Sequence, residues 1–205
     1  MKKNKLSRKE REQLQRRALI LQAALELFSE KGYHNVTMQE IAIRAEFAVG
    51  TLYKFFKNKE ELYKEILMQT ANLFRSALSN VLEEKGDEYA QVKKYLKTKC
   101  KLFMENILLV RLYFAEAGAG VSISVKRELE TELRSFYEQV IQKLACVFEK
   151  GIQKKFFRPL DPYYLALAFD GMSNAFLFSG LEDPDRHPVD TNLIEEIFFE
   201  QIYLT

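Results

Sequence analysis

The stretch TLYKFFKNKEEL, residues 51–62, concentrates side chains that could hold an anion. Lysine ammonium groups carry positive charge, and threonine and tyrosine hydroxyls can donate hydrogen bonds. The residues of this kind in the stretch are Thr51, Tyr53, Lys54, Lys57 and Lys59. Two apolar residues between them, Leu52 and Phe56, are predicted to anchor such a surface from beneath. The pattern therefore favours a surface that grips an anionic partner.

The sequence contains few residues that are suited to catalysis or metal binding. The 205 residues include two histidines, His34 and His187, and two cysteines, Cys100 and Cys146. Both cysteines lie in apolar helical patterns, where we expect buried free thiols rather than a disulfide or a metal pair. The sequence AGAG at 117–120 lacks the strand and the lysine of a phosphate-binding loop. We therefore expect no enzyme, no metal and no cofactor.

Charge is distributed unevenly along the chain, although its net value is only +2. Residues 1–64 hold 14 Lys and Arg against 8 Glu, whereas residues 65–205 hold 17 against 21 Asp and Glu. A basic N-terminal part followed by an acidic remainder suits contact with nucleic acid through the N-terminal part, although a solvated basic face gives the same pattern. No apolar run is long enough to span a membrane, and no apolar segment follows the basic N-terminus. We expect a cytoplasmic protein.

The elements that must position residues 51–62 are helices, because helix formers dominate and Gly and Pro are few. A first helix is expected over 7–31, with Leu14 in its apolar stripe and Gly32 at its end. Thr37 and Glu40 form a capping box that opens a short second helix. A third helix is expected from about residue 48, and Asn58 should cap a longer fourth one. Two short helices joined by a tight turn make a helix-turn-helix over about 37–56.

The remainder of the chain also reads as helical, so the fold class is all-α. Amphipathic helices are expected over 87–109, 111–117, 124–150, 161–180 and 191–203. The last two carry apolar residues on more than one side, so that one side can pack inward while the other needs a partner.

The continuous stretch ILQAALELFSEKGYHNVTMQEIAIRAEFAVGTLYKFFKNKEEL, residues 20–62, resembles the TetR family of bacterial transcriptional regulators. The shared features are Ala-x-x-x-Phe, Gly-Tyr, Thr-x-x-x-Ile-Ala, Gly-Thr-Leu-Tyr-x-x-Phe and Lys-Glu-Glu-Leu. The resemblance implies a three-helix DNA-binding head, residues 1–60, and a helical ligand-binding and dimerisation body, residues 61–205.

By that resemblance, residues 49–54 form a recognition helix in the major groove of DNA. The implied DNA-contacting residues are Thr37, Val49, Gly50, Thr51, Tyr53, Lys54 and Lys59. The first residues of the helix would face base edges, whereas Lys59 would pair with a phosphate. The basic arm, residues 2–17, is expected to add phosphate or minor-groove contacts.

The turn before this helix departs from the family pattern, which usually has Gly and then Ser where the chain reads Glu46-Phe47-Ala48. Glu46 in a left-handed conformation costs about 1 kcal/mol. Ala48 has no side-chain oxygen, so the missing cap costs about 1 kcal/mol more. These changes affect base contacts and the operator sequence rather than the fold.

For the body, the resemblance implies a homodimer through residues 161–180 and 191–203 and a small, largely apolar or aromatic inducer. The candidate pocket residues are Phe74, Phe103, Met104, Ile107, Phe114, Phe136, Tyr137, Asn174 and Phe176, with Lys99, Arg111, Tyr113 and Asp170 as further polar candidates. The expected function is that of a homodimeric repressor released from a palindromic operator by the inducer. A transcriptional activator of the same family, or a helical adaptor without DNA binding, remains the alternative.

Overall fold

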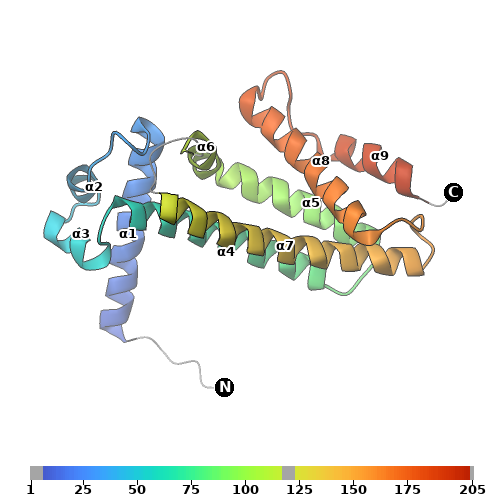
Figure 1. Cartoon of the computed structure of the whole chain (residues 1–205), viewed down its shortest axis with the longest axis horizontal. Helices are drawn as coiled ribbons and strands as arrows, with labels where there is room; N and C mark the ends of the chain where they lie inside the picture. The colour runs from blue at the N-terminus through green and yellow to red at the C-terminus, as the bar shows by residue number, and fades with distance from the viewer. Residues whose placement is uncertain (1–6, 117–122, 204–205) are drawn as a thin grey trace. The chain divides into compact units, whose positions relative to one another are not determined.

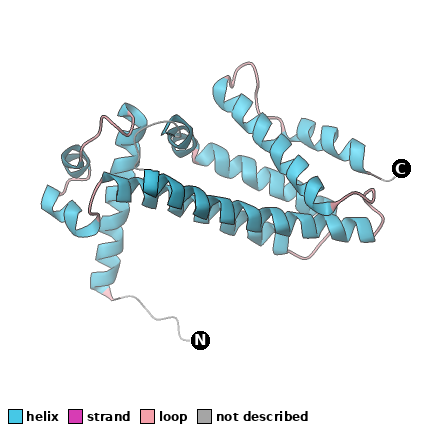
Figure 2. Ribbon diagram, viewed as in Figure 1, coloured by secondary structure: helices cyan, strands magenta, loops and turns pink. Residues whose placement is uncertain are grey.

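The computed structural model describes the backbone of residues 7–116 and 123–203, and the side chains of 7–113 and 127–203. This part of the chain is helical and contains no named strand, which confirms the all-α prediction (Figure 2). The helices are α1 (Arg8–Lys31), α2 (Met38–Arg44), α3 (Val49–Phe55), α4 (Lys59–Glu83), α5 (Glu88–Glu105), α6 (Ile107–Glu116), α7 (Ile123–Gln153), α8 (Pro162–Glu182) and α9 (Thr191–Ile202) (Figure 1). None of the described helices is long and apolar enough to cross a membrane.

The chain divides into two compact units. One combines residues 1–69 with 108–130, and the other combines residues 70–107 with 131–205. The first unit contains α1, α2, α3, the start of α4 and most of α6, and we call its part from α1 to the start of α4 the head. The second contains α5, α8, α9 and most of α7, which we call the body.

Local capping fixes the helix ends of the head. Ser7 caps α1, and Gly32 ends it with a φ of 77°, which glycine adopts without a steric penalty. At α2, the Glu40 amide donates to Thr37 Oγ1 at 3.2 Å, and the Thr37 amide donates to Glu40 Oε2 at 2.8 Å. Asn58 Oδ1 accepts from the Glu61 amide at 2.8 Å at the start of α4. The predicted capping residues are therefore confirmed.

The capping box of α2 makes a direct prediction. Thr37→Ala should lower the free energy of unfolding of the protein by about 1 kcal/mol, because the Glu40 amide at the start of α2 loses its side-chain acceptor. Thr37→Ser should cost much less, since serine keeps the accepting oxygen. Urea unfolding followed by circular dichroism measures the difference, and equal losses for the two variants would contradict a capping role.

The core of the head begins half-way along α1, where Ile20, Ala24 and Phe28 are buried. Leu52 of α3 and Phe56, which follows α3, are buried as well. Leu14 is 54% exposed, so its predicted place in the apolar stripe is wrong. The N-terminal turns of α1 run on beyond α2 and α3, which leaves Leu14 without a surface to pack against (Figure 1).

The body has an aromatic core. Phe148 of α7, Phe169 of α8 and Phe198 of α9 lie with ring centroids 4.7–6.2 Å apart. Asp161 accepts from the amides of Tyr163 and Tyr164 and so caps α8, with Pro162 in the first turn as predicted. Of the two cysteines, Cys100 is buried but Cys146 is exposed, because Cys146 lies on the outer side of α7. The prediction of a buried thiol is therefore wrong for Cys146.

One predicted helix boundary is also wrong. The sequence predicts a single helix over 87–109, but α5 ends at Glu105. The Asn106 side chain donates to Leu102 O at 2.8 Å, and its amide donates to the same carbonyl at 3.1 Å. These bonds close the last turn of α5, so that α6 begins at Ile107 rather than at about 111.

Candidate functional site

The turn between α2 and α3 has the conformation that the sequence predicts. Glu46 has a φ of 60°, in the left-handed region that disfavours residues with a Cβ atom. The Phe47 amide donates to Ala42 O at 2.9 Å and closes the end of α2. Ala48 precedes α3 and provides no side-chain cap. The turn therefore holds α3 at a fixed angle despite two locally unfavourable residues.

Most of the predicted DNA-contacting residues of α3 lie on one exposed face. Val49, Gly50, Tyr53 and Lys54 are exposed, and Tyr53 exposes 53% of its surface. Thr51 is half-buried, and Leu52 is fully buried beneath the helix. Residues that are one helical turn apart share a face, so the first turn of α3 and the Tyr53–Lys54 pair form one continuous surface.

Ile43 extends this surface and is missed by the sequence reasoning. It is 72% exposed although it lies within α2 beside the buried pair Ile41 and Ala42. With Val49 it offers apolar contact at the junction of α2 and α3, which suits the methyl group of thymine. The signal in the sequence was an isoleucine off the apolar stripe of a short helix.

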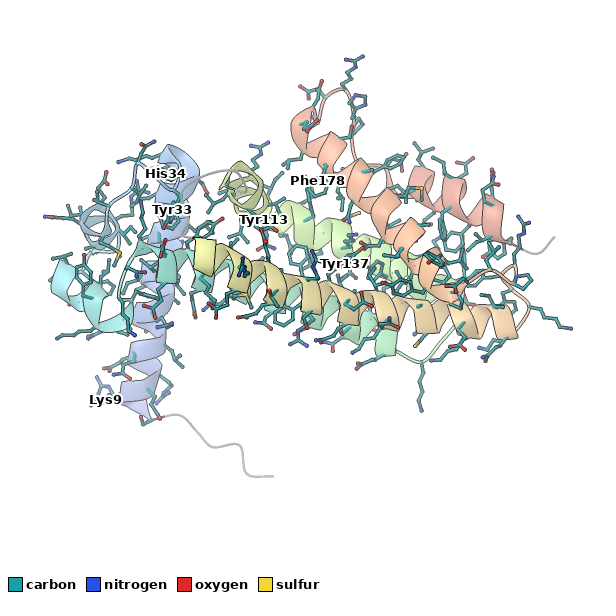
Figure 3. The ribbon with its side chains drawn as sticks, in the orientation of Figure 1. Lys9, Tyr33, His34, Tyr113, Tyr137 and Phe178 are labelled. Atoms are coloured by element: carbon teal, nitrogen blue, oxygen red, sulfur yellow. The ribbon has the colours of Figure 1, made fainter. Side chains whose placement is uncertain are left out.

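Backbone carbonyls hold Lys59 in the protein without DNA, and its phosphate contact stays a prediction. Its Nζ donates to the carbonyls of Tyr33 at 2.6 Å, His34 at 3.2 Å and Val36 at 2.7 Å, and it lies 4.4 Å from the Tyr33 ring centroid. An ammonium has three donors, so these carbonyls use its capacity in the unbound protein. Lys59 thereby fixes the loop between α1 and α2, and Figure 3 shows Tyr33 and His34 in this region.

Other cations of the head brace the helices. The Arg44 guanidinium bonds both carboxylate oxygens of Glu30, at 3.0 and 2.9 Å, which raises the Arg44 pKa. Arg17 lies 4.3 Å from the Phe56 ring centroid and 3.3 Å from Glu65 Oε2. By contrast, Lys9, Arg11 and Arg16 are exposed on the N-terminal half of α1. Figure 3 shows Lys9 near the start of this helix. The predicted arm continues into residues 2–6, which lie outside the described part of the chain.

The body contains a buried polar cluster centred on Asp170 of α8. Tyr95 Oη and Lys99 Nζ of α5 both donate to Asp170 Oδ1, the tyrosine at 2.6 Å, and Asn174 Nδ2 donates to Oδ2 at 3.1 Å. Burial raises the pKa of Tyr95 well above its usual value, and burial also lowers the pKa of Lys99. Lys99, Asp170 and Asn174 were candidates from the sequence, and the structure brings these three together.

Tyr137 of α7 adds a phenol near this cluster. Burial and the neighbouring Asp170 raise its pKa, although 42% of the residue is exposed. Figure 3 shows Tyr137 on α7 and Phe178 on α8 directed toward α5. The Phe178 ring lies 5.7 Å from the Phe103 ring, so Phe178 is an aromatic neighbour that the sequence reasoning left out.

The other predicted pocket residues are spread over the two units. Phe103 is buried, Phe74, Ile107, Phe136 and Phe176 are half-buried, and Met104 is 53% exposed. The side chain of Phe114 lies outside the described residues, and Arg111 and Tyr113 belong to the other unit. A cavity of about 330 Å³ lies elsewhere in the body, and its lining includes none of these residues; the lining is Tyr89, Asn192, Glu195, Glu196, Phe199, Glu200 and Tyr203.

The fold and the exposed α3 face define a helix-turn-helix regulator of transcription. Residues 20–66 match the family model of bacterial regulatory proteins of the tetR family. The chain belongs to the TetR family of bacterial transcriptional regulators.

Two relatives and one solved structure illustrate the similarity. YhgD of Bacillus subtilis, an uncharacterised HTH-type transcriptional regulator, is 28% identical over 166 residues, which span 77% of this chain and 84% of YhgD. The fatty acid metabolism regulator protein of Bacillus subtilis is 35% identical over 143 residues, 65% of this chain and 66% of that protein. SmeT, the repressor of the Stenotrophomonas maltophilia multidrug efflux pump SmeDEF, superposes with a TM-score of 0.72 at 18% identity, covering 92% of this chain and 90% of SmeT. Such relatives are regulators rather than enzymes, as the sequence predicts.

Proposed function

We propose that the protein is a cytoplasmic homodimeric repressor that binds a palindromic operator and leaves it when a small, largely apolar inducer enters the body. The observation that carries the proposal is the exposed face of α3, with Val49, Gly50, Tyr53 and Lys54 held over the buried Leu52. A helix presented in this way fits the major groove. Residues 1–60 are the proposed DNA-binding domain, and residues 61–205 bind ligand and dimerise.

Within the head, the proposal divides the residues by task. Base edges are contacted by Val49, Gly50 and Thr51, together with Ile43. The phosphate backbone of the DNA is contacted by Tyr53, Lys54 and Thr37. Lys59 holds the loop that carries Thr37 and reaches phosphate only if it gives up a carbonyl partner. This division keeps the predicted set of residues but moves Lys59 to a supporting role.

The salt dependence of DNA binding distinguishes the proposed roles of Lys54 and Lys59. Lys54→Gln should reduce the slope of log affinity against log salt by about 1.8, because each of the two protomers loses one phosphate contact. Lys59→Met should leave the slope nearly unchanged and instead lower the free energy of unfolding, since three carbonyls lose their donor. Fluorescence anisotropy with a labelled duplex measures the slopes, and a matching loss of slope in Lys59→Met would show that Lys59 contacts phosphate.

For dimerisation, the proposal uses an exposed stripe on α8. Tyr164, Ala168, Gly171 and Ala175 recur at spacings of three and four, and all are exposed. On α9, Leu193 and Ile197 each expose 43% of their surface. Small residues let two helices approach closely, and apolar ones gain by burial, so the stripe suits pairing of α8 and α9 with their copies.

For the inducer, the proposal places an apolar ligand near Phe103, Tyr137, Asn174 and Phe178, with the buried Asp170 cluster as its polar boundary. The names of two similar proteins refer to fatty acid metabolism and to multidrug efflux, and both fit a largely apolar ligand. Native mass spectrometry of the purified protein should detect the dimer with a bound small molecule. The same molecule should then release the protein from DNA, because coupling between two sites is reciprocal.

Selection of duplexes from a random library tests the proposal as a whole. A two-fold symmetric consensus with half-sites one or two helical turns apart would support a dimeric repressor. Reporter expression that falls when the consensus overlaps the promoter separates a repressor from an activator. Recovery of no sequence, with no salt-dependent binding to any duplex, would favour the helical adaptor.

A further inference from the structure

The cavity beside α9, which we call the α9 cavity, combines acidic and aromatic side chains. Its carboxylates come from Glu195, Glu196 and Glu200, and its rings come from Tyr89, Phe199 and Tyr203. Its volume of about 330 Å³ is at the lower end of the range for small-ligand sites. All of its lining residues belong to the body.

Glu195 has one carboxylate oxygen without a hydrogen-bond partner. Only 6% of this residue is exposed, yet it lines the α9 cavity. Its Oε2 pairs with Lys93 Nζ at 2.8 Å, whereas its Oε1 is buried and accepts no hydrogen bond from the described residues. Buried polar atoms are nearly always paired, so this oxygen points to a donor that binds from outside the chain.

The three rings form a compact aromatic group beside this carboxylate. The Tyr89 centroid lies 4.5 Å from that of Phe199 and 5.5 Å from that of Tyr203, and the last two rings are 5.8 Å apart. The faces of such rings attract cations. The Lys93 ammonium makes such a contact, because it lies 5.0 Å from the Tyr89 centroid and also pairs with the Glu195 carboxylate.

The arrangement favours an organic cation over a metal ion. Among the described residues, no three acidic, histidine or cysteine side chains converge as metal ligands. Burial, with further contributions from Tyr89 and Asp87, raises the pKa of Tyr203 to about 12, so its hydroxyl stays neutral and can accept a hydrogen bond from an ammonium. Spread carboxylates and apolar ring faces together suit a ligand with a charged nitrogen and several carbon atoms.

We propose that the α9 cavity binds a small alkylammonium ion, whose nitrogen meets Glu195 and Glu200 and whose carbon atoms lie against Tyr89, Phe199 and Tyr203. This site is separate from the exposed face of α3 and from the residues proposed for the apolar inducer. It would give the regulator a second ligand, of opposite character to the first.

Isothermal titration of the full chain, without DNA, tests the site. Butylammonium and putrescine are the probes, and 1-butanol is the uncharged analogue of butylammonium. We expect at least one cation to bind, and its affinity to exceed that of the alcohol by about tenfold. Glu195→Gln and Glu200→Gln should each weaken binding of the cation by about tenfold.

The control variant is Glu149→Gln, which removes an exposed carboxylate of α7 outside the cavity. It should leave binding unchanged. Thermal unfolding and native mass spectrometry report whether each variant is folded and dimeric, because Glu200 shares a face of α9 with Ile197, which is proposed for pairing. Glu200→Gln serves if Glu195→Gln does not fold. The proposal would be overturned if neither cation bound at millimolar concentration or if the alcohol bound as tightly as the cation. It would also be overturned if the folded glutamine variants bound the cation as tightly as the wild-type protein does.

Discussion

Gly171→Arg should convert the protein to a monomer and lower its affinity for operator DNA by about 10²- to 10⁴-fold. The substitution adds a long charged side chain at the centre of the exposed α8 stripe, where the proposed partner helix must approach. A monomer loses the second half-site, and with it the gain from linked binding. Sedimentation or native mass spectrometry gives the oligomeric state, and anisotropy gives the affinity.

The change should not damage the protomer itself. A Cβ atom at Gly171 meets no heavy atom within 4 Å, and arginine favours a helix more than glycine does. The matched control is Gln139→Arg, which adds the same charge at an exposed position on α7. A Gly171→Arg protein that remains a dimer, or a Gln139→Arg protein that becomes a monomer, would contradict the assignment of the α8 stripe.

Asp170→Leu should lower the free energy of unfolding by about 3–5 kcal/mol. The substitution leaves the Lys99 ammonium buried without its carboxylate, and removing one partner of a buried ion pair has a cost of that order. It also removes acceptors from Tyr95 and Asn174. Urea unfolding monitored by circular dichroism measures the loss.

The pH dependence of this variant separates a stranded charge from a mere cavity. The folded pKa of Lys99 is already lowered by burial, and without Asp170 it should fall further. The unfolded chain then binds more protons than the folded one, so the stability of the variant should rise with pH up to about 10.4. The triple variant Tyr95→Phe, Lys99→Met, Asp170→Leu should recover most of the loss. A triple variant as unstable as Asp170→Leu would mean that the loss of stability comes from altered packing and not from the unpaired charge of Lys99.

The sequence predicts those features of the head that depend on neighbours in the chain. The capping box at Thr37 involves two residues three positions apart, and the missing cap at Ala48 follows from the residue type alone. The left-handed turn at Glu46 is expected instead from the resemblance to the TetR family. The helix count and the buried Leu52 follow from the same local periodicity. Such features are set by backbone donors and acceptors, which the residue types reveal directly.

Features that depend on distant segments could not be predicted in the same way. Leu14 and Cys146 fit apolar helical patterns, yet each lies on a side that no other element covers. The three carbonyls that hold the Lys59 ammonium belong to a loop 23 to 26 residues earlier, and the phosphate contact of Lys59 stays a prediction. Tyr95 and Asp170 are 75 residues apart, and only the packing of α5 on α8 brings them together.

The salt dependence of binding to a selected duplex tests the central proposal most directly. We predict that the wild-type protein binds the duplex as a dimer, with log affinity falling linearly as log salt rises. The combined variant Tyr53→Phe, Lys54→Gln should bind more weakly and with a smaller slope, while keeping its fold. Binding that is independent of salt, or unchanged in the folded variant, would contradict the assignment of the exposed α3 face to DNA.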